Sequence, residues 1–244
     1  MRPVASLIVT VRLHPLRQAR PDWGVSPRTP VGLIATGAGI GAILCAAAAL
    51  VGWAIAGVLG AAGGVIGVAV VVVAGTSAQR RWLLGTTGAR PVGASDAPRV
   101  TNLVRGQAEG VAVPATMVFD RPDPNAFIWG GRRPVIALSR GAVEGFTRTE
   151  IEALVTHCFT RLSSGAGRAL PIAVLIGRLA ARAGPLVTTT EDVVAAASTR
   201  YPPALRSALA KCSPARGALA PAFFVAEGWS HTPVADRIQA LEDL

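Results

Sequence analysis

No charged residue occurs between Thr29 and Gln79, and this run constrains the fold more than any other feature of the chain. A transmembrane helix needs about 20 apolar residues, so the run is too long for one span and long enough for two. We expect one helix near Val31–Val51 and another near Ala56–Thr76, joined by a tight turn around residues 52–54. Trp53 would then lie at the membrane interface. A buried helical hairpin inside a soluble protein is the alternative.

Small residues are spaced along both expected helices and would let their backbones approach closely. They are Gly37, Gly41, Gly60, Gly64 and Gly67. The sequence therefore predicts a two-helix transmembrane hairpin over residues 31–78, preceded by a basic N-terminal arm over residues 1–30 and followed by one domain over residues 79–244.

Arginines flank both ends of the uncharged run and predict its orientation. Arg17, Arg20 and Arg28 precede it, and Arg80 and Arg81 follow it. Because basic residues stay on the cytoplasmic side, both termini should be cytoplasmic, in a multi-pass protein of a bacterial-type inner (plasma) membrane. A cleaved signal peptide is a poorer explanation, since the charged region is too long and the apolar run continues past any cleavage site.

The formal net charge of +10 comes almost entirely from arginine. The arginines gather at the membrane flanks and show no alternation with aromatic residues, so contact with anionic lipid is a better explanation than nucleic-acid binding. Cys45, Cys158 and Cys212 are widely separated, which predicts no disulfide framework and favours a reducing compartment.

An amphipathic helix is predicted over Thr147–Ser163. Thr147 and Glu150 have the spacing of a capping box, and apolar residues recur every three or four positions from Ile151 to Leu162. His157 and Arg161 are four residues apart and should project from one face.

The rest of the domain is predicted to mix short strands with helices. Ala169–Val187 is apolar but contains Arg178 and Arg182, which favours an interfacial or buried amphipathic helix over a third membrane span. The other expected elements are a helix over Asp96–Ala112, strands at Thr116–Asp120 and Pro134–Ser139, and helices over Glu191–Thr199, Pro203–Cys212 and Pro233–Leu244.

Several segments resemble the HtpX-like family of membrane zinc metalloproteases, which also contains the CAAX prenyl protease. The matching segments are Asp123–Phe127, Gly130-Gly131, the stretch TEIEALVTH that ends at His157, Ser230–Pro233 and Asp236–Ile238. The resemblance implies an α+β chain whose second part is a zincin-like, mostly helical domain with a small antiparallel sheet. It also implies that Asn125, Ala126 and Phe127 form a strand that binds an extended substrate or partner peptide. A simple turn-and-core role for these three residues is the alternative.

The resemblance fails at the catalytic residues. The family's HExxH helix supplies two zinc-binding histidines and a glutamate that activates water, but this chain has His157-Cys158-Phe159-Thr160-Arg161. The family takes its third ligand from a downstream helix, where the resemblance places Thr190, with Glu191 as the alternative. We therefore expect no metal, and we interpret His157, Cys158, Arg161, Thr190, Glu191 and His231 as vestigial positions.

Each vestigial position also has a simpler interpretation. His157 is expected to be a hydrogen-bonded core histidine, and Cys158 a buried cysteine rather than a nucleophile. Arg161 could fill the zinc volume and pair with Glu191 or Asp192, or it could be solvated.

The sequence favours a membrane-anchored pseudoprotease that binds a protein partner or belongs to a membrane complex. The alternative is an active zinc metalloendopeptidase with unorthodox ligands, for which zinc would be the cofactor.

Overall fold

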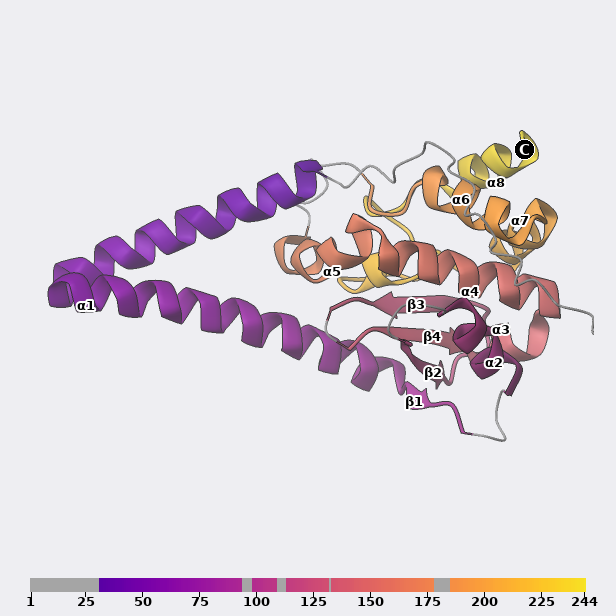
Figure 1. Cartoon of the computed structure of the whole chain (residues 1–244), viewed down its shortest axis with the longest axis horizontal. Helices are drawn as coiled ribbons and strands as arrows, with labels where there is room; N and C mark the ends of the chain where they lie inside the picture. Colours follow the sequence, from indigo (N-terminus) through magenta and orange to yellow (C-terminus); the bar gives the residue numbers. More distant parts are fainter. Residues whose placement is uncertain (1–30, 94–97, 109–112, 132, 178–184) are drawn as a thin grey trace, which may run out of the picture.

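The computed structural model describes residues 31–93, 98–108, 113–131, 133–177 and 185–244. It combines one long helix, α1 (Val31–Thr87), with a mostly helical domain built around a small mixed sheet (Figure 1). The predicted basic arm over residues 1–30 and both Arg178 and Arg182 lie outside the described residues.

Helix α1 is bent into two arms that meet at a kink and diverge toward the domain (Figure 1). Ala56 and Gly57 have non-helical backbone angles, and Gly57 has φ of +61°, a left-handed conformation that glycine adopts without steric cost. The chain therefore reverses a few residues later than the predicted turn at 52–54.

The two arms touch next to the kink, where small residues face each other. A Cβ added to Gly60 would lie 1.9 Å from the carbonyl oxygen of Gly52, and one added to Gly64 would lie 2.3 Å from that of Ala48. Gly41 and Gly67 have open space instead. The predicted close approach is thus confirmed for Gly60 and Gly64, whose partners are Gly52 and Ala48.

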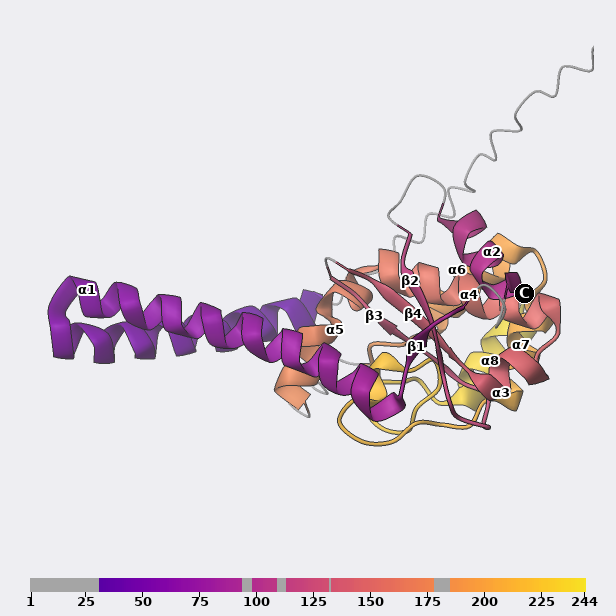
Figure 2. The ribbon, with the colours of Figure 1, turned by 90° about the horizontal axis from the view of Figure 1, so that it is seen from below.

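The apolar surface of α1 is not covered by the domain. Among the described residues, Ala38–Thr87 is the one helical segment long and apolar enough to cross a membrane, and its most apolar window has no residue buried inside the molecule. Figure 2, seen from below, shows both arms extending away from the domain. The helix also continues past the predicted boundary at residue 78 to Thr87, and Leu83 is fully buried in the core of the domain.

Four strands form one sheet in the order β1-β2-β4-β3. They are β1 (Arg90–Pro91), β2 (Ala115–Phe119), β3 (Ala126–Trp129) and β4 (Val135–Ser139). β3 and β4 form an antiparallel hairpin, but β2 and β4 pair in parallel. The prediction of an antiparallel sheet was therefore wrong. After β2 the chain crosses to the edge of the sheet, where it forms β3. It then returns through the hairpin, so that β4 lies between β2 and β3.

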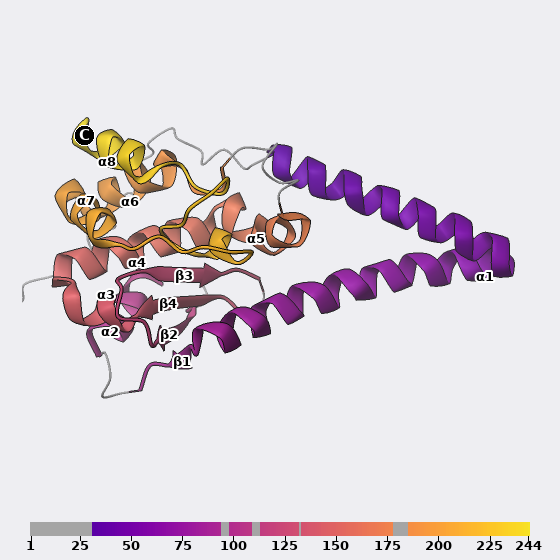
Figure 3. The ribbon, with the colours of Figure 1, turned by 180° about the vertical axis from the view of Figure 1, so that it is seen from behind.

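The helices agree with the predicted segments to within a few residues at each end, except that, among the described residues, the segment predicted as Ala169–Val187 is helical only over Gly165–Ile176 and that the short helix Arg140–Gly145 was not predicted. They are α2 (Pro98–Gln107), α3 (Arg140–Gly145), α4 (Arg148–Ser163), α5 (Gly165–Ile176), α6 (Thr189–Thr199), α7 (Pro202–Lys211) and α8 (Val234–Glu242), with a 3₁₀ turn, η2, at Ala220–Ala222. In Figure 1, α4 lies between β3 on one side and α6, α7 and α8 on the other. Figure 3 shows from behind that α5 lies where the arms of α1 meet the domain.

Helix α4 begins as predicted, but it is not amphipathic. Thr147 accepts a hydrogen bond from the backbone of Glu150, whose side chain accepts one from the backbone of Thr147, so the capping box is confirmed. Because helices and strands enclose α4, polar residues such as His157 and Arg161 are buried along with the apolar ones. The positions of this helix that were predicted to be vestigial therefore belong to the core.

Candidate functional site

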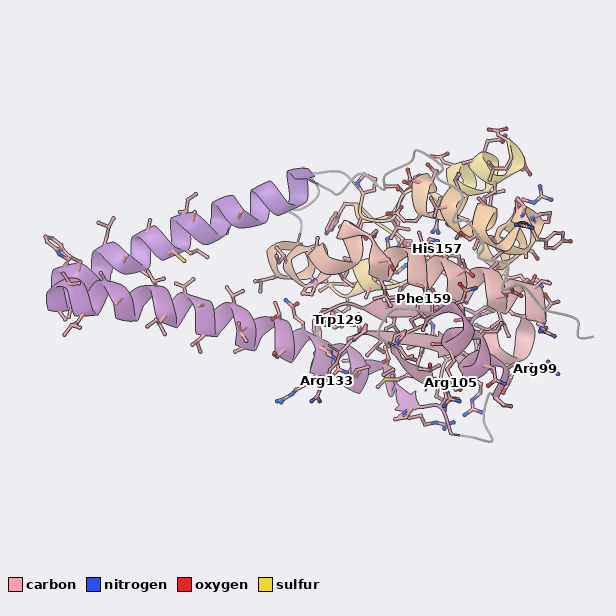
Figure 4. The ribbon with its side chains drawn as sticks, in the orientation of Figure 1. Arg99, Arg105, Trp129, Arg133, His157 and Phe159 are labelled. Atoms are coloured by element: carbon pink, nitrogen blue, oxygen red, sulfur yellow. The ribbon has the colours of Figure 1, made fainter. Side chains whose placement is uncertain are left out.

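His157 is fully buried on the side of α4 that faces α6 and α8, opposite Phe159 (Figure 4). Its Nδ1 lies 3.1 Å from Oδ1 of Asp192, a close contact without good hydrogen-bond geometry, and its Nε2 has no protein partner. Its ring meets that of Phe224 edge to face, with centroids 4.8 Å apart. Burial lowers the pKa of His157 more than the Asp192 carboxylate raises it, so the imidazole is neutral. The prediction of a core histidine is therefore confirmed for its burial, but the predicted hydrogen bond of the ring is not formed.

Asp192 is held by an arginine that lies far away in the sequence. Arg237 of α8 donates from Nε and Nη2 to the two carboxylate oxygens of Asp192, at 2.7 and 2.8 Å, and both side chains are fully buried. Its Nη1 donates to the carbonyl oxygen of Phe224 at 2.8 Å. Burial alone would raise the pKa of Asp192, but the charge and hydrogen bonds of Arg237 lower it to about 2. This bidentate pair fixes α6 to α8 beneath His157.

Arg161 is buried as proposed from the sequence, but the predicted pair with Glu191 or Asp192 is wrong. Its Nη1 donates to the carbonyl oxygen of Phe223 at 2.8 Å, and its Nη2 donates to that of Pro221 at 2.9 Å. Its Nε has no partner. Burial lowers the pKa of Arg161 to about 10, which leaves it charged at neutral pH. Both oxygens of Asp192 accept hydrogen bonds from Arg237 instead. The charge of Arg161 is therefore stabilised at close range by the dipoles of the two carbonyl groups.

His231 shares one of the carbonyl groups that bind Arg161. Its Nε2 lies 2.9 Å from the carbonyl oxygen of Phe223, so the Nε2 proton is donated there. Its Nδ1 then accepts from the hydroxyl of Ser230 at 2.8 Å. Burial, followed by the charge of Arg161, lowers the pKa of His231 to about 3. A neutral histidine with both nitrogens engaged acts here as a structural hydrogen-bonding group.

Cys158 and the start of α6 lie near this cluster without adding a reactive group to it. Burial raises the pKa of Cys158 to about 12, even though the charge of Arg161 opposes the shift, so the side chain is a thiol. Glu191 accepts hydrogen bonds from the backbone and hydroxyl of Thr188, and thereby caps its own helix. Thr190 is only half-buried. Neither candidate for a third zinc ligand is placed as a ligand.

The side chain of Asn125 joins the start of β3 to residues 213 and 225 by hydrogen bonds. Its side-chain amide donates to the carbonyl oxygens of Ser213 at 2.7 Å and Val225 at 2.9 Å, and its Oδ1 accepts from the backbone of Ala126 and Val225. Asn125, Ala126 and Phe127 are all completely buried. These contacts fit the turn-and-core role.

The outer edge of β3 is occupied by the chain itself. The backbone of Phe224 donates to the carbonyl oxygen of Ala126 at 2.7 Å, and Phe127 forms an antiparallel bridge with Phe223. Phe223, Phe224 and Val225 are all buried, which anchors this segment in the core. In this structure, the edge predicted to receive an extended peptide holds the chain's own residues 223–225.

A catalytic zinc of the HExxH type needs three protein donors with free lone pairs. The described part of the chain contains no group of three His, Cys, Asp or Glu side chains placed to hold a metal ion. At the second histidine position Arg161 presents only donors, and Cys158 replaces the carboxylate base. The residues present do not fit a zinc of this type.

The sequence pointed to most of these residues but missed the role of Arg237 and the carbonyl groups of residues 221–224. In the sequence, Arg237 stands out only as part of the segment Asp236–Ile238 that resembles the family. Its one available signal was an arginine on the otherwise apolar face formed by Val234, Ile238 and Leu241.

Comparisons with known proteins find short stretches of similarity to proteases named HtpX. The chain is 39% identical over 59 residues to Protease HtpX of Alkalilimnicola ehrlichii, which covers 23% of this chain and 20% of that protein. It is 35% identical over 68 residues to that of Baumannia cicadellinicola, covering 26% and 23%, and 36% identical over 66 residues to that of Vibrio cholerae, covering 25% and 23%.

The matched region is thus about a fifth to a quarter of the length of these relatives. No family model matches the chain, and no solved structure matches it. The partial similarity supports a relationship to the metallopeptidase family of HtpX.

Proposed function

We propose that this chain is a membrane-anchored, non-hydrolytic relative of HtpX that acts by binding a protein partner or as part of a membrane complex. The observation that carries the proposal is the guanidinium of Arg161, which is buried one helical turn from His157 and donates to the carbonyl oxygens of Pro221 and Phe223. A fixed cation here opposes a divalent metal, and Cys158 supplies no base for activating water.

The apolar arms of α1 would form a hairpin through the membrane, with the domain on the cytoplasmic side. Support comes from the length of the uncharged run and from Arg80 and Arg81 immediately after it. Because residues 223–225 cover the edge of β3, the protein partner would bind a surface other than that edge.

One observation favours the alternative, an active zinc metalloendopeptidase with unorthodox ligands. His157 has a carboxylate beside Nδ1 and no partner on Nε2, which is how a metal-binding histidine is commonly oriented.

Zinc content separates the two functions. We expect the purified full-length protein to contain far less than one zinc per chain after dialysis and to leave unfolded casein intact. The informative variant is His157→Ala, with His231→Asn as a matched control that removes the other buried histidine. Stoichiometric zinc that disappears in His157→Ala, with casein cleavage, would overturn the proposal in favour of the enzyme.

A further inference from the structure

The end of α5 lies against a part of α1 that is apolar. Ala169, Leu170 and Ala173 bury one face of α5 in the domain. On the other side, a Cβ added to Gly75 of α1 would lie 3.8 Å from Cδ1 of Leu175. Leu175 nevertheless remains 47% exposed, so α1 covers it only partly.

The position of Gly75 along α1 sets the depth of this contact. From the kink at Gly57, Gly75 is about five helical turns away, or roughly 27 Å at about 1.5 Å per residue. The hydrocarbon core of a bilayer is about 30 Å thick. If the kink lies at the far boundary of this core, Gly75 is still inside the near boundary, and the divergence of the two arms places it deeper (Figure 1).

The residues that come next on α1 suit the headgroup layer. Arg80, Arg81 and the half-exposed Trp82 follow Gly75 by one to two turns. Arg133 lies at the end of the domain from which α1 extends (Figure 4). Trp229 is half-buried and packs on the cluster formed by Ala169, Ala173 and Leu186. Arginine and tryptophan are the residues that settle at the boundary between lipid and water.

We propose that the last turn of α5, led by Leu175, inserts into the lipid leaflet nearest the domain, so that the domain rests on the bilayer. The occupant of this apolar surface is the membrane itself, because the surface continues directly into that of α1. The inference rests on the proposed membrane insertion of α1. It adds a second, shallow anchor to the hairpin.

The test is a spin label on the full-length protein in vesicles of phosphatidylethanolamine and phosphatidylglycerol. A background with Cys45→Ala and Cys212→Ala removes the two partly exposed cysteines, while Cys158 is buried in the core and poorly accessible to the label. Labels are placed by Leu175→Cys and by two controls, Ile66→Cys on α1 and Tyr201→Cys on the domain, which are 62% and 52% exposed.

The assay measures how often each spin label collides with oxygen, which is concentrated in lipid, and with a water-soluble nickel chelate, which stays in water. We expect the labels at Leu175 and Ile66 to favour oxygen several-fold and the label at Tyr201 to favour nickel. If Leu175 resembles Tyr201 while Ile66 remains in lipid, the α5 anchor is refuted and the hairpin stands. If Ile66 is also in water, membrane anchoring fails, and the α5 anchor fails with it.

Discussion

Replacing Arg161 by methionine tests whether its guanidinium stabilises the buried site around His157. Methionine has a similar length without charge or donors, so it leaves the carbonyl oxygen of Pro221 unpaired, while that of Phe223 keeps His231. Each hydrogen bond from a charged donor contributes about 1.5–3 kcal/mol, and a buried unpaired carbonyl costs about 1–3 kcal/mol. Removing a buried cation that lacks an acidic partner offsets part of this loss. We expect a net destabilisation of about 2–4 kcal/mol.

The assay is urea unfolding of the full-length protein in detergent, followed by tryptophan fluorescence. Arg206→Met is the matched control, because Arg206 makes a half-exposed ion pair with Glu242 at 3.4 Å and should change stability by about 1 kcal/mol or less. Arg161→Lys should fall between the wild type and Arg161→Met, since one ammonium cannot span both carbonyl groups as the planar guanidinium does.

A double-mutant cycle identifies the partner of Arg161. Coupling with Glu191 should be about 0.5 kcal/mol or less, because that carboxylate is bound to Thr188. Coupling with His231 should be larger, because both side chains donate to the carbonyl oxygen of Phe223. Wild-type stability for Arg161→Met, or strong coupling to Glu191, would refute this explanation of the site.

The remaining predictions concern pH, capping, zinc repair and topology. Burial lowers the pKa of both His157 and His231, the latter to about 3, so the unfolded state takes up protons first and stability should fall as pH drops below about 6.5. Urea titrations from pH 7 to 5 should show a slope of up to about 1.4 kcal/mol per pH unit per histidine, and a shallower one for His231→Asn. Thr147→Ala should cost about 1 kcal/mol in the same urea assay, by removing the capping box. Cys158→Glu combined with Arg161→His should bind zinc weakly and leave casein intact, since Arg237 holds both oxygens of Asp192 and Glu191 is bound to Thr188, so neither acid is free to serve as the third ligand. Reporter fusions at the two termini should both give cytoplasmic signals, and opposite signals would rule out the hairpin.

Local patterns in the sequence were enough to predict most elements of the fold. The capping residues Thr147 and Glu150 located the start of α4, and short runs rich in β-branched and apolar residues located β2 and β4. The parallel pairing of β2 with β4 could not be predicted, because strand direction depends on how the chain crosses between them. The position of the kink could not be predicted either, because several glycines in this run could have adopted the conformation that Gly57 has.

The candidate site shows the same division between local and distant information. Burial of Arg161 was one of two alternatives, a solvated arginine being the other, because the resemblance places this residue at a zinc-ligand position. Its true partners, the carbonyl groups of Pro221 and Phe223, carry no side-chain signature and lie about 60 residues further along the chain. Asp192 was a reasonable candidate partner until the structure showed Arg237 occupying both of its oxygens.

The second arm of α1 runs without interruption from the kink to Thr87, and Leu83 near its end is buried in the domain. No flexible linker therefore separates the apolar second arm of α1 from the sheet, whose first strand begins at Arg90. A helix of this length is stiff, so a change in its tilt must turn the whole domain, much as a lever turns the body to which it is fixed. With α1 inserted in a bilayer as proposed, the bilayer thickness would set the angle between the domain and the membrane surface. The same helix would carry a pull on the domain directly into the membrane.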